Sequence, residues 1–130
     1  MADAYATFAT GGIHRPAAAI TKIVDRDNNV IYEWADEPVQ AVDREVACAA
    51  IKVMKTVMTE GTATAAQLQT GQETAGKTGT SENYRDHWLC AYTPQLSTAV
   101  WIGSREEREI PGVDCCFVWR TFMTDRKSVV

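Results

Sequence analysis

A short segment near the middle of the chain carries the residues best suited to chemistry. Residues 71–81 read GQETAGKTGTS, in which Lys77 is followed by the hydroxyl side chains of Thr78 and Thr80, with Gly79 between them. An ammonium group beside hydroxyl groups can bind an anion, either a phosphate or a carboxylate. The segment therefore predicts an anion site, and its structural setting decides which anion is bound.

One interpretation of this segment is a phosphate-binding loop. Gly71, Gly76, Lys77 and Thr78 match the pattern G-x-x-x-x-G-K-[ST], which holds phosphates between a buried strand and a helix N-terminus. The residues before Gly71 read TATAAQLQT, which is not an apolar strand, and the residues after Thr78 do not open a helix. A nucleotide-binding domain that uses residues 71–78 is therefore the weaker alternative.

The other interpretation places Lys77-Thr78-Gly79 on a β-strand that lines a carboxylate site. The Lys77 ammonium would attract the carboxylate and strengthen the field around a nucleophile, while the hydroxyls of Thr78 and Thr80 would position it. Gly79 would let the strand approach an acyl group closely. A strand N–H that faces the ligand could donate to a developing oxyanion. This interpretation requires antiparallel strands after the motif.

The sequence after the motif predicts such strands. Residues 75–81, 87–92 and 96–103 are strand candidates, and the second and third are rich in aromatic and β-branched residues. The turn between the last two, Thr-Pro-Gln at 93–95, is too short for anything but an antiparallel connection. The strand interpretation is therefore favoured.

Helices and a hairpin are predicted around this sheet. A helix over residues 1–12 ends at a Gly-Gly pair, and Asp-Asn-Asn at 27–29 predicts the turn of a β-hairpin. A short helix is predicted over 64–68. The closing helix at 115–123 is expected to pack Phe117 or Val118 against Phe122.

The longest predicted helix follows Asp43, which is a suitable N-cap residue. Gly61 is expected to end this helix in a left-handed turn. Four apolar residues recur at steps of four, three and four and should share the buried face. They are Val46, Ala50, Val53 and Val57.

Composition excludes several classes of function. With 130 residues and 45% hydrophobic residues, the chain has the size and composition of one globular domain. Its net charge of −4 contains no block of either sign, which argues against nucleic-acid binding. No apolar run reaches the roughly 18 residues of a membrane span, and no secretory signal is present.

The cysteines do not predict a metal centre. None of the four forms a C-x-x-C pair, so zinc spacing is missing and no metal or cofactor is expected. Cys48 is expected to be a small buried residue in a helix. A bridge from Cys90 to Cys115 or Cys116 stays open.

Other polar and aromatic residues have structural interpretations. Trp88, Trp101 and Trp119 are expected to pack in the core or at the rim of the site. Asp86 and His87 are adjacent on a predicted strand, so they point to opposite faces and should not act as an acid–base pair. The residues just before them, at 84–85, could contact a substrate.

The order of these segments resembles a known family. The stretches MADAYATFATGGIHRP, GTATAA, AGKTGTS, DHWLCAYTP and STAVWIG follow one another as in the transpeptidase domain of class A penicillin-binding proteins. The resemblance covers roughly residues 1–123. It implies an α+β, β-lactamase/transpeptidase-like fold, in which helices flank an antiparallel sheet beside the substrate cleft.

The resemblance also implies roles for the motif. Lys77, Thr78, Gly79 and Thr80 would form the K-T-G wall of the active site. Lys77, Thr78 and Thr80, with a minor part for Ser81, would bind the carboxylate of a D-Ala-D-Ala stem peptide of peptidoglycan or of a β-lactam. The Thr80 N–H would be one of two oxyanion donors, and the nucleophilic serine would supply the other.

The sequence departs from the family in one respect. It contains no S-x-x-K, the motif of the nucleophile and its activating lysine. Ser81-Glu82-Asn83 satisfies S-x-N on paper, but it directly follows K-T-G and cannot face it across a cleft. Residues 1–130 are therefore expected to be the C-terminal portion of a transpeptidase domain, inactive alone. The apolar surface that this portion leaves uncovered could make it dimerise.

The resemblance further implies a bacterial parent protein at the extracytoplasmic face of the membrane, with an N-terminal anchor and often a glycosyltransferase domain. The alternative within the same fold is a non-catalytic binding or sensor module.

Overall fold

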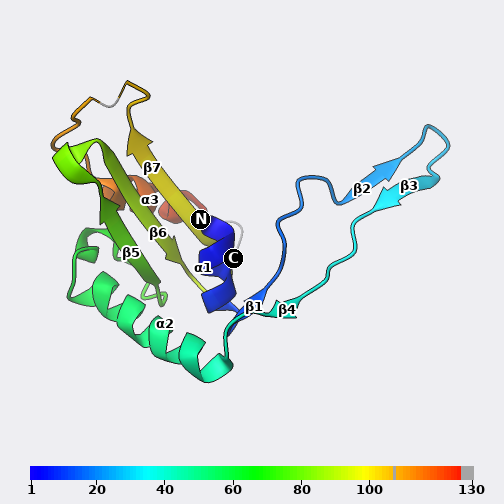
Figure 1. Ribbon diagram of the computed structural model, residues 1–130, viewed down its shortest axis with the longest axis horizontal. Helices are drawn as coiled ribbons and strands as arrows, with labels where there is room; N and C mark the ends of the chain where they lie inside the picture. Colours follow the sequence, from blue (N-terminus) through cyan, green and yellow to red (C-terminus); the bar gives the residue numbers. More distant parts are fainter. Residues whose placement is uncertain (107, 127–130) are drawn as a thin grey trace.

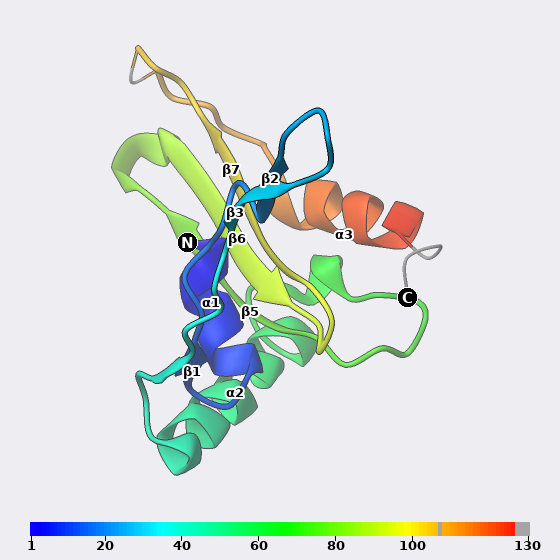
Figure 2. The same ribbon diagram turned by 90° about the vertical axis from the view of Figure 1, so that its right-hand side faces the viewer.

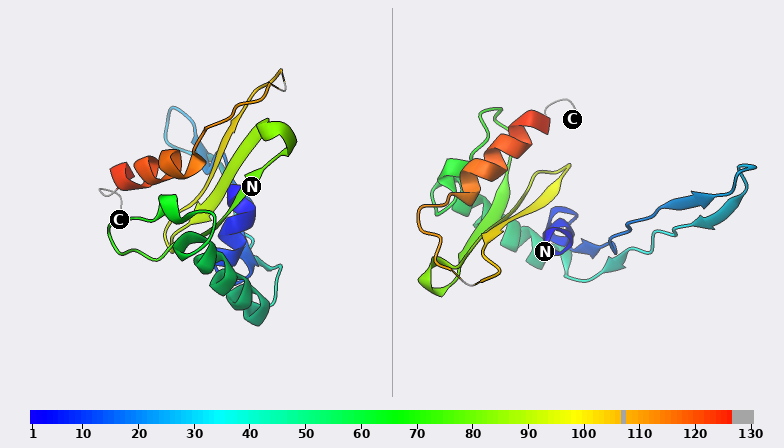
Figure 3. Two further views of the ribbon diagram at one scale, coloured as in Figure 1. Left: turned by 90° about the vertical axis from the view of Figure 1, so that its left-hand side faces the viewer. Right: turned by 90° about the horizontal axis from the view of Figure 1, so that it is seen from above.

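The computed structural model describes residues 1–106 and 108–126. Its centre is a three-stranded antiparallel sheet in the order β5-β6-β7. Helix α1 lies on one face of this sheet and α3 on the other, while α2 packs along β5 (Figures 1 and 3). The bounds are α1 Ala2–Ala9, α2 Arg44–Thr59, β5 Ala75–Thr80, β6 Asp86–Tyr92, β7 Ser97–Gly103 and α3 Cys115–Asp125.

The sheet confirms the three predicted strands and the short turn between the last two. Thr93 closes that turn, because its N–H donates to the Leu96 carbonyl at 2.9 Å and its hydroxyl accepts from the Leu96 N–H at 3.2 Å. A 3₁₀ turn, η2 (Glu82–Tyr84), connects β5 to β6. Among the described strands, β5 pairs with β6 alone.

Two small two-stranded sheets lie between α1 and α2 in the sequence. Strand β1 (Ile13–His14) pairs with β4 (Val39–Gln40), and β2 (Lys22–Val24) pairs with β3 (Val30–Glu33). The β2–β3 hairpin projects away from the sheet (Figures 1 and 2). Its turn contains Asn28 at φ 64°, which confirms the turn predicted from Asp-Asn-Asn.

Helix α2 begins directly after Asp43 as predicted, although the Asp43 side chain makes no capping hydrogen bond. The predicted buried face was only partly right, because Val57 packs against the core and Ala50 is half-buried, but the two other residues are not buried. Val46 and Val53 are 57% and 67% exposed, whereas Ala47 and Met58 are fully buried. The helix is thus rotated so that a small residue, Ala47, faces inward, which allows close packing against α1 and β5.

Gly61 ends this region for a different reason from the one predicted. Its φ is not positive, but a Cβ at this position would lie 2.8 Å from the Val57 Cα atom. Only glycine allows the chain to fold back so tightly over the last turn of α2. A short 3₁₀ helix, η1 (Thr64–Ala66), then replaces the helix predicted to reach residue 68.

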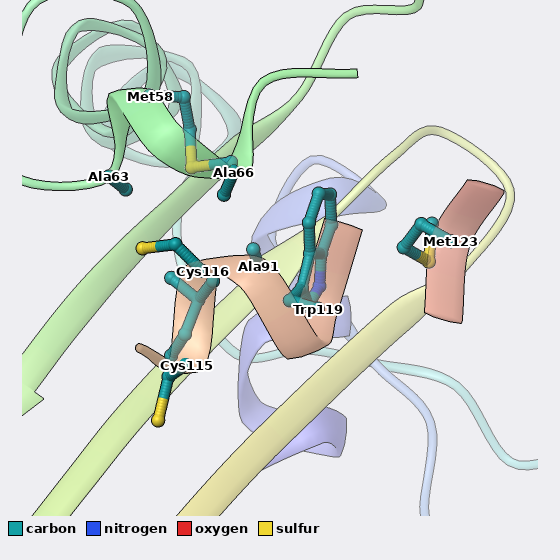
Figure 4. Packing of buried hydrophobic residues seen from close by; sticks show 9 residues of the cluster. Met58, Ala63, Ala66, Ala91, Cys115, Cys116, Trp119 and Met123 are labelled. Atoms are coloured by element: carbon teal, nitrogen blue, oxygen red, sulfur yellow. The ribbon is translucent and has the colours of Figure 1, made fainter. Parts of the chain in front are cut away.

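The hydrophobic core lies between α2, η1, α3 and the sheet (Figure 4). Trp119 of α3 is fully buried there. Phe117, Val118 and Phe122, which were predicted to pack together, are 57%, 42% and 39% exposed and lie outside this core, and their mutual contact stays a prediction. The start of α3 is fixed by its cap, because the Asp114 side chain accepts a hydrogen bond from the Cys116 N–H at 2.8 Å. The cluster comprises Met58, Ala63, Ala66, Leu89, Ala91, Cys115, Cys116, Trp119 and Met123.

The other face of the sheet carries α1. The Ser97 hydroxyl donates to the Ala2 carbonyl at 2.7 Å and ties α1 to β7. Beneath α1, burial raises the pKa of Tyr92 to about 12, and the nearby Tyr5 adds to this shift. The buried Tyr92 hydroxyl has no hydrogen-bond partner among the described residues.

All four cysteines are free, and Cys48 is exposed rather than buried as predicted. Because β6 alternates its side chains, Cys90 faces α1, whereas Cys115 and Cys116 belong to the core on the α3 face. The sheet therefore separates Cys90 from the pair, so the bridge that the sequence left open does not form. Within the described ranges, no helix combines the length and apolarity needed to cross a bilayer.

Candidate functional site

The predicted motif lies on β5, the edge strand of the sheet. The Ser81 N–H donates to the Asp86 carbonyl at 2.9 Å, and backbone groups alternate in direction along an antiparallel strand. The N–H and C=O groups of Lys77 and Gly79 therefore point toward β6. Those of Thr78 and Thr80 point away from it, and we call this side the free edge. Within residues 1–106 and 108–126, no strand pairs with the free edge.

The Lys77 ammonium group lies at this free edge. Its Nζ atom donates to the Thr78 carbonyl oxygen at 2.8 Å, and that oxygen is one of the groups pointing away from β6. Among the described residues, no carboxylate lies within ion-pair distance of Nζ. The positive charge is exposed and free to meet an anionic ligand.

The side chains of the motif do not all share one face of the sheet. Thr78 pairs with Leu89 of the core, so Thr78 and Thr80 project toward the α3 face. Lys77 and Gly79 project toward the opposite face, next to α1. The feature common to Lys77, Thr78 and Thr80 is therefore the free edge, where a cation, a hydroxyl-bearing residue and an unpaired N–H meet.

The Thr78 hydroxyl has a partner that the sequence did not reveal. Thr62 Oγ1 lies 2.6 Å from Thr78 Oγ1. Thr62 directly follows Gly61, so the tight turn after α2 delivers it to β5. No motif marks Thr62, because the contact joins residues that are 16 positions apart and depends on tertiary packing.

The Ser81 hydroxyl forms its hydrogen bonds in the turn after the motif and not at the free edge. Its hydroxyl accepts from the Asp86 N–H at 2.8 Å and donates to Asp86 Oδ2 at 3.2 Å. Asp86 Oδ1 in turn accepts from Trp101 Nε1 at 2.9 Å. These bonds fix the end of β5, on which Thr80 lies.

The remaining polar candidates are structural or peripheral. His87 Nε2 lies 2.9 Å from the Ile110 carbonyl oxygen, on the opposite face from Asp86, so the two do not form an acid–base pair. Tyr84 stacks on His87 with ring centroids 6.2 Å apart and is exposed at the η2 turn. Its contact with a substrate stays a prediction, as does that of Arg85.

The aromatic residues divide between core and rim. Trp119 is fully buried, as expected for core packing. Trp88 and Trp101 pair across β6 and β7 with ring centroids 6.1 Å apart. They lie beside Gly79, since a Cβ there would first meet the Trp88 Cβ atom at 3.4 Å. This pair therefore borders the motif on the α1 face.

The phosphate-loop interpretation was wrong. Gly76, Lys77 and Thr78 lie inside a β-strand, and the next long element is another strand rather than a helix. No helix N-terminus therefore stands at Lys77 and Thr78 to hold a phosphate. The motif instead lies on a strand that is followed by two antiparallel strands, as the other interpretation predicted.

Comparison with known proteins identifies the family of the chain. The family model described as "Penicillin binding protein transpeptidase domain" matches residues 1–106. The chain belongs to this family. The predicted resemblance to penicillin-binding transpeptidases is thereby confirmed.

Individual penicillin-binding proteins match over most of the chain. It is 33% identical over 125 residues to penicillin-binding protein 1A of Clostridium novyi, covering 95% of this chain and 14% of that protein. The D,D-transpeptidase domain of a peptidoglycan glycosyltransferase from Eggerthella lenta superimposes with a TM-score of 0.80 at 23% identity. The match covers 98% of this chain and 31% of that one.

A third likeness is to penicillin-binding protein A of M. tuberculosis in an imipenem acyl-enzyme complex. Its TM-score is 0.74 at 21% identity, over 99% of this chain and 30% of that one. The two structural likenesses confirm the predicted α+β, transpeptidase-like fold. The chain spans only 14% of its C. novyi relative.

Proposed function

We propose that this chain forms the carboxylate-binding and oxyanion wall of a serine D,D-transpeptidase, which cross-links peptidoglycan stem peptides. The observation that supports this most is the free edge of β5. There, the Lys77 ammonium lies beside the outward-facing backbone groups of Thr78 and Thr80. A wall of this kind binds a terminal carboxylate while it offers an N–H to the neighbouring carbonyl.

In the proposed reaction, Lys77 and the Thr78 and Thr80 hydroxyls hold the carboxylate of a D-Ala-D-Ala end. A serine attacks the carbonyl of the penultimate residue, and the Thr80 N–H stabilises the oxyanion. The terminal D-Ala leaves, and an amine of a second stem peptide takes over the acyl group. Gly79 keeps the strand surface flat at the acyl group.

The nucleophile would come from a longer chain. The 130 residues contain no S-x-x-K, and the family relatives are several times longer. β-Lactams would react as carboxylate-bearing mimics of the same substrate, as the imipenem adduct of the M. tuberculosis protein suggests. We further propose that the whole enzyme acts at the extracytoplasmic face of a bacterial membrane, where peptidoglycan is cross-linked, and is held there by an N-terminal anchor.

The same incompleteness would favour self-association of the isolated chain. The β2–β3 hairpin exposes apolar side chains such as Ile23, Ile31 and Tyr32. Exposed apolar surface of this kind is normally covered by other protein. We expect a concentration-dependent dimer of the 130-residue chain in sedimentation experiments.

A fluorescent penicillin tests the proposal. The full-length protein should form a covalent adduct, whereas the 130-residue chain should form none because it lacks the serine. In the full-length protein, Lys77→Ala should slow labelling roughly 100-fold or more, since a charge-assisted contact to the carboxylate is lost. Lys52→Ala, an exposed lysine of α2, serves as the matched control and should label normally.

Each result has a distinct meaning. An adduct on the 130-residue chain would show that it carries its own nucleophile. Normal labelling of Lys77→Ala would refute the role of Lys77. A full-length protein that binds the penicillin reversibly but never reacts would be a non-catalytic binding or sensor module instead.

A further inference from the structure

The contact between Thr62 and Thr78 raises the question of which hydroxyl donates. At 2.6 Å, the two Oγ1 atoms are within the normal range for an O–H···O hydrogen bond. Each hydroxyl has one proton and can accept from others. If Thr78 donates to Thr62, its proton is unavailable to a ligand. If Thr62 donates, the Thr78 proton is free.

A bound carboxylate settles this direction, because an ionised carboxylate only accepts hydrogen bonds. Thr78 can donate to it only when Thr62 donates to Thr78. We propose that Thr62 is a positioning residue, whose hydroxyl donates to Thr78 and thereby directs the Thr78 proton to the substrate carboxylate. This inference rests on the proposed function of the free edge.

The local fold holds Thr62 in place for this task. Before it, Gly61 packs directly over Val57, where even a Cβ would meet the Val57 Cα atom at 2.8 Å. After it, Ala63 is fully buried, and its N–H donates to the Val57 carbonyl at 3.1 Å. The Thr62 backbone is therefore fixed on both sides, while its side chain remains exposed beside Thr78.

The Thr78 backbone is also held in place, by its neighbour strand β6. It pairs with Leu89 of β6, which is fully buried in the core. The two hydroxyls thus meet on rigid backbone rather than on mobile loops, and this lowers the entropic cost of directing the proton. Lys77 reaches the same edge from the opposite face of the sheet and contributes a positive charge. The hydroxyl pair orients the Thr78 proton toward the carboxylate.

The test measures acylation of the full-length protein by a β-lactam with a free carboxylate and by its methyl ester. Thr62→Val keeps the shape of the side chain but removes the donor. It should slow acylation by the free acid roughly two- to tenfold, the range for one hydrogen bond, and leave the rate with the ester unchanged. Thr62→Ser retains the hydroxyl and should stay close to the wild-type rate.

A double-variant cycle and a control complete the design. Thr62→Val should add nothing further in a Thr78→Val background, because its effect acts through Thr78. Thr59→Val is the control, since the Thr59 hydroxyl donates to the Lys55 carbonyl within α2 at 3.2 Å and has no other partner among the described residues. That variant should acylate normally with both compounds.

The possible failures are distinguishable. If Thr62→Val slows the free acid and the ester equally, or has no effect while Thr78→Val does, the positioning role is refuted and the proposed function survives. If neither Thr78→Val nor Lys77→Ala slows acylation by the free acid, the proposed carboxylate site itself is wrong.

Discussion

Strand β5 contains two glycines whose surroundings predict opposite effects of substitution by alanine. At Gly76, a Cβ would lie 2.6 Å from the Ala91 Cβ atom, 2.7 Å from the Cys90 carbonyl oxygen and 2.9 Å from the Ala91 Cα atom. At Gly79, a Cβ would meet only the Trp88 Cβ atom, at an ordinary 3.4 Å. Gly76 is thus required by the fold, whereas Gly79 is not.

The expected magnitudes follow from these distances. The atoms around Gly76 are mostly backbone atoms, which cannot move aside on their own. The added methyl group should therefore lower the free energy of unfolding by about 1–3 kcal/mol. Replacing glycine by alanine also restricts the unfolded chain, which raises the free energy of unfolding by about 0.4–1 kcal/mol at either position. Gly76→Ala should therefore lower the melting temperature by roughly 2–10 °C. Gly79→Ala should leave the melting temperature unchanged or slightly higher.

Two measurements separate the fold from the function. Thermal unfolding of the 130-residue chain, followed by circular dichroism, gives the stability of both variants. Acylation of the full-length protein by a fluorescent penicillin gives the activity, which Gly79→Ala should reduce because the added methyl group stands beside the proposed acyl position. Equal melting temperatures for Gly76→Ala and Gly79→Ala would refute the reasoning from β5–β6 spacing.

Three further predictions compare buried with exposed side chains or concern a buried ionisable group. Trp119→Ala should lower the free energy of unfolding, measured in urea, by about 3–5 kcal/mol. Phe122→Ala, on the exposed side of α3, should lower it far less. Similar losses for the two variants would contradict the helix face that the structure buries. Because burial raises the pKa of Tyr92 to about 12, stability should be lost as pH rises from the ordinary tyrosine value of 10 through 12. Tyr92→Phe should weaken this loss in melting temperatures measured against pH, and an unchanged slope would count against it. A thiol reagent at pH 8 should label Cys48 first, since burial raises the pKa of Cys116 to about 11; Cys48→Ser should abolish the fast phase.

The elements with strong local signals could be predicted from the sequence. The strands of the sheet follow from β-branched and aromatic runs, and the Thr-Pro-Gln turn allows only an antiparallel connection. The positive φ of Asn28 follows from its side chain, which tolerates that conformation. These features depend on neighbours in the sequence, so one sequence is enough to predict them.

The inward faces of the helices could not be predicted in the same way. In α2, the valine series that includes Val46 and the series that includes Ala47 both recur at helical spacing, and hydrophobicity favours the valines. The structure buries Ala47 because a small residue lets the helix approach its neighbours. In α3, Trp119 is buried and Phe117 is exposed, although both residues are aromatic. Such choices depend on the partner surface, which a sequence pattern does not contain.

The candidate site shows the same division. Lys77, Thr78 and Thr80 stand out because their residue types and spacing suit a carboxylate. Thr62 did not stand out, because its contact with Thr78 exists only once α2 packs against β5. Only the sheet register reveals which backbone groups lie at the free edge. Sequence reasoning therefore proposed the charged and polar groups of the candidate site but not how they are positioned.

The alternation along β5 explains how one short strand can serve both the fold and the site. The backbone groups of Lys77 and Gly79 join β5 to β6, so the sheet does not depend on those of Thr78 and Thr80. The N–H of Thr80 can remain unpaired in the sheet without structural cost, because it lies at an exposed edge where a ligand or water can satisfy it. In a central strand, that N–H would donate to a second neighbouring strand. The edge position of β5 is therefore a condition for the proposed chemistry, since it leaves an oxyanion donor free on a rigid element.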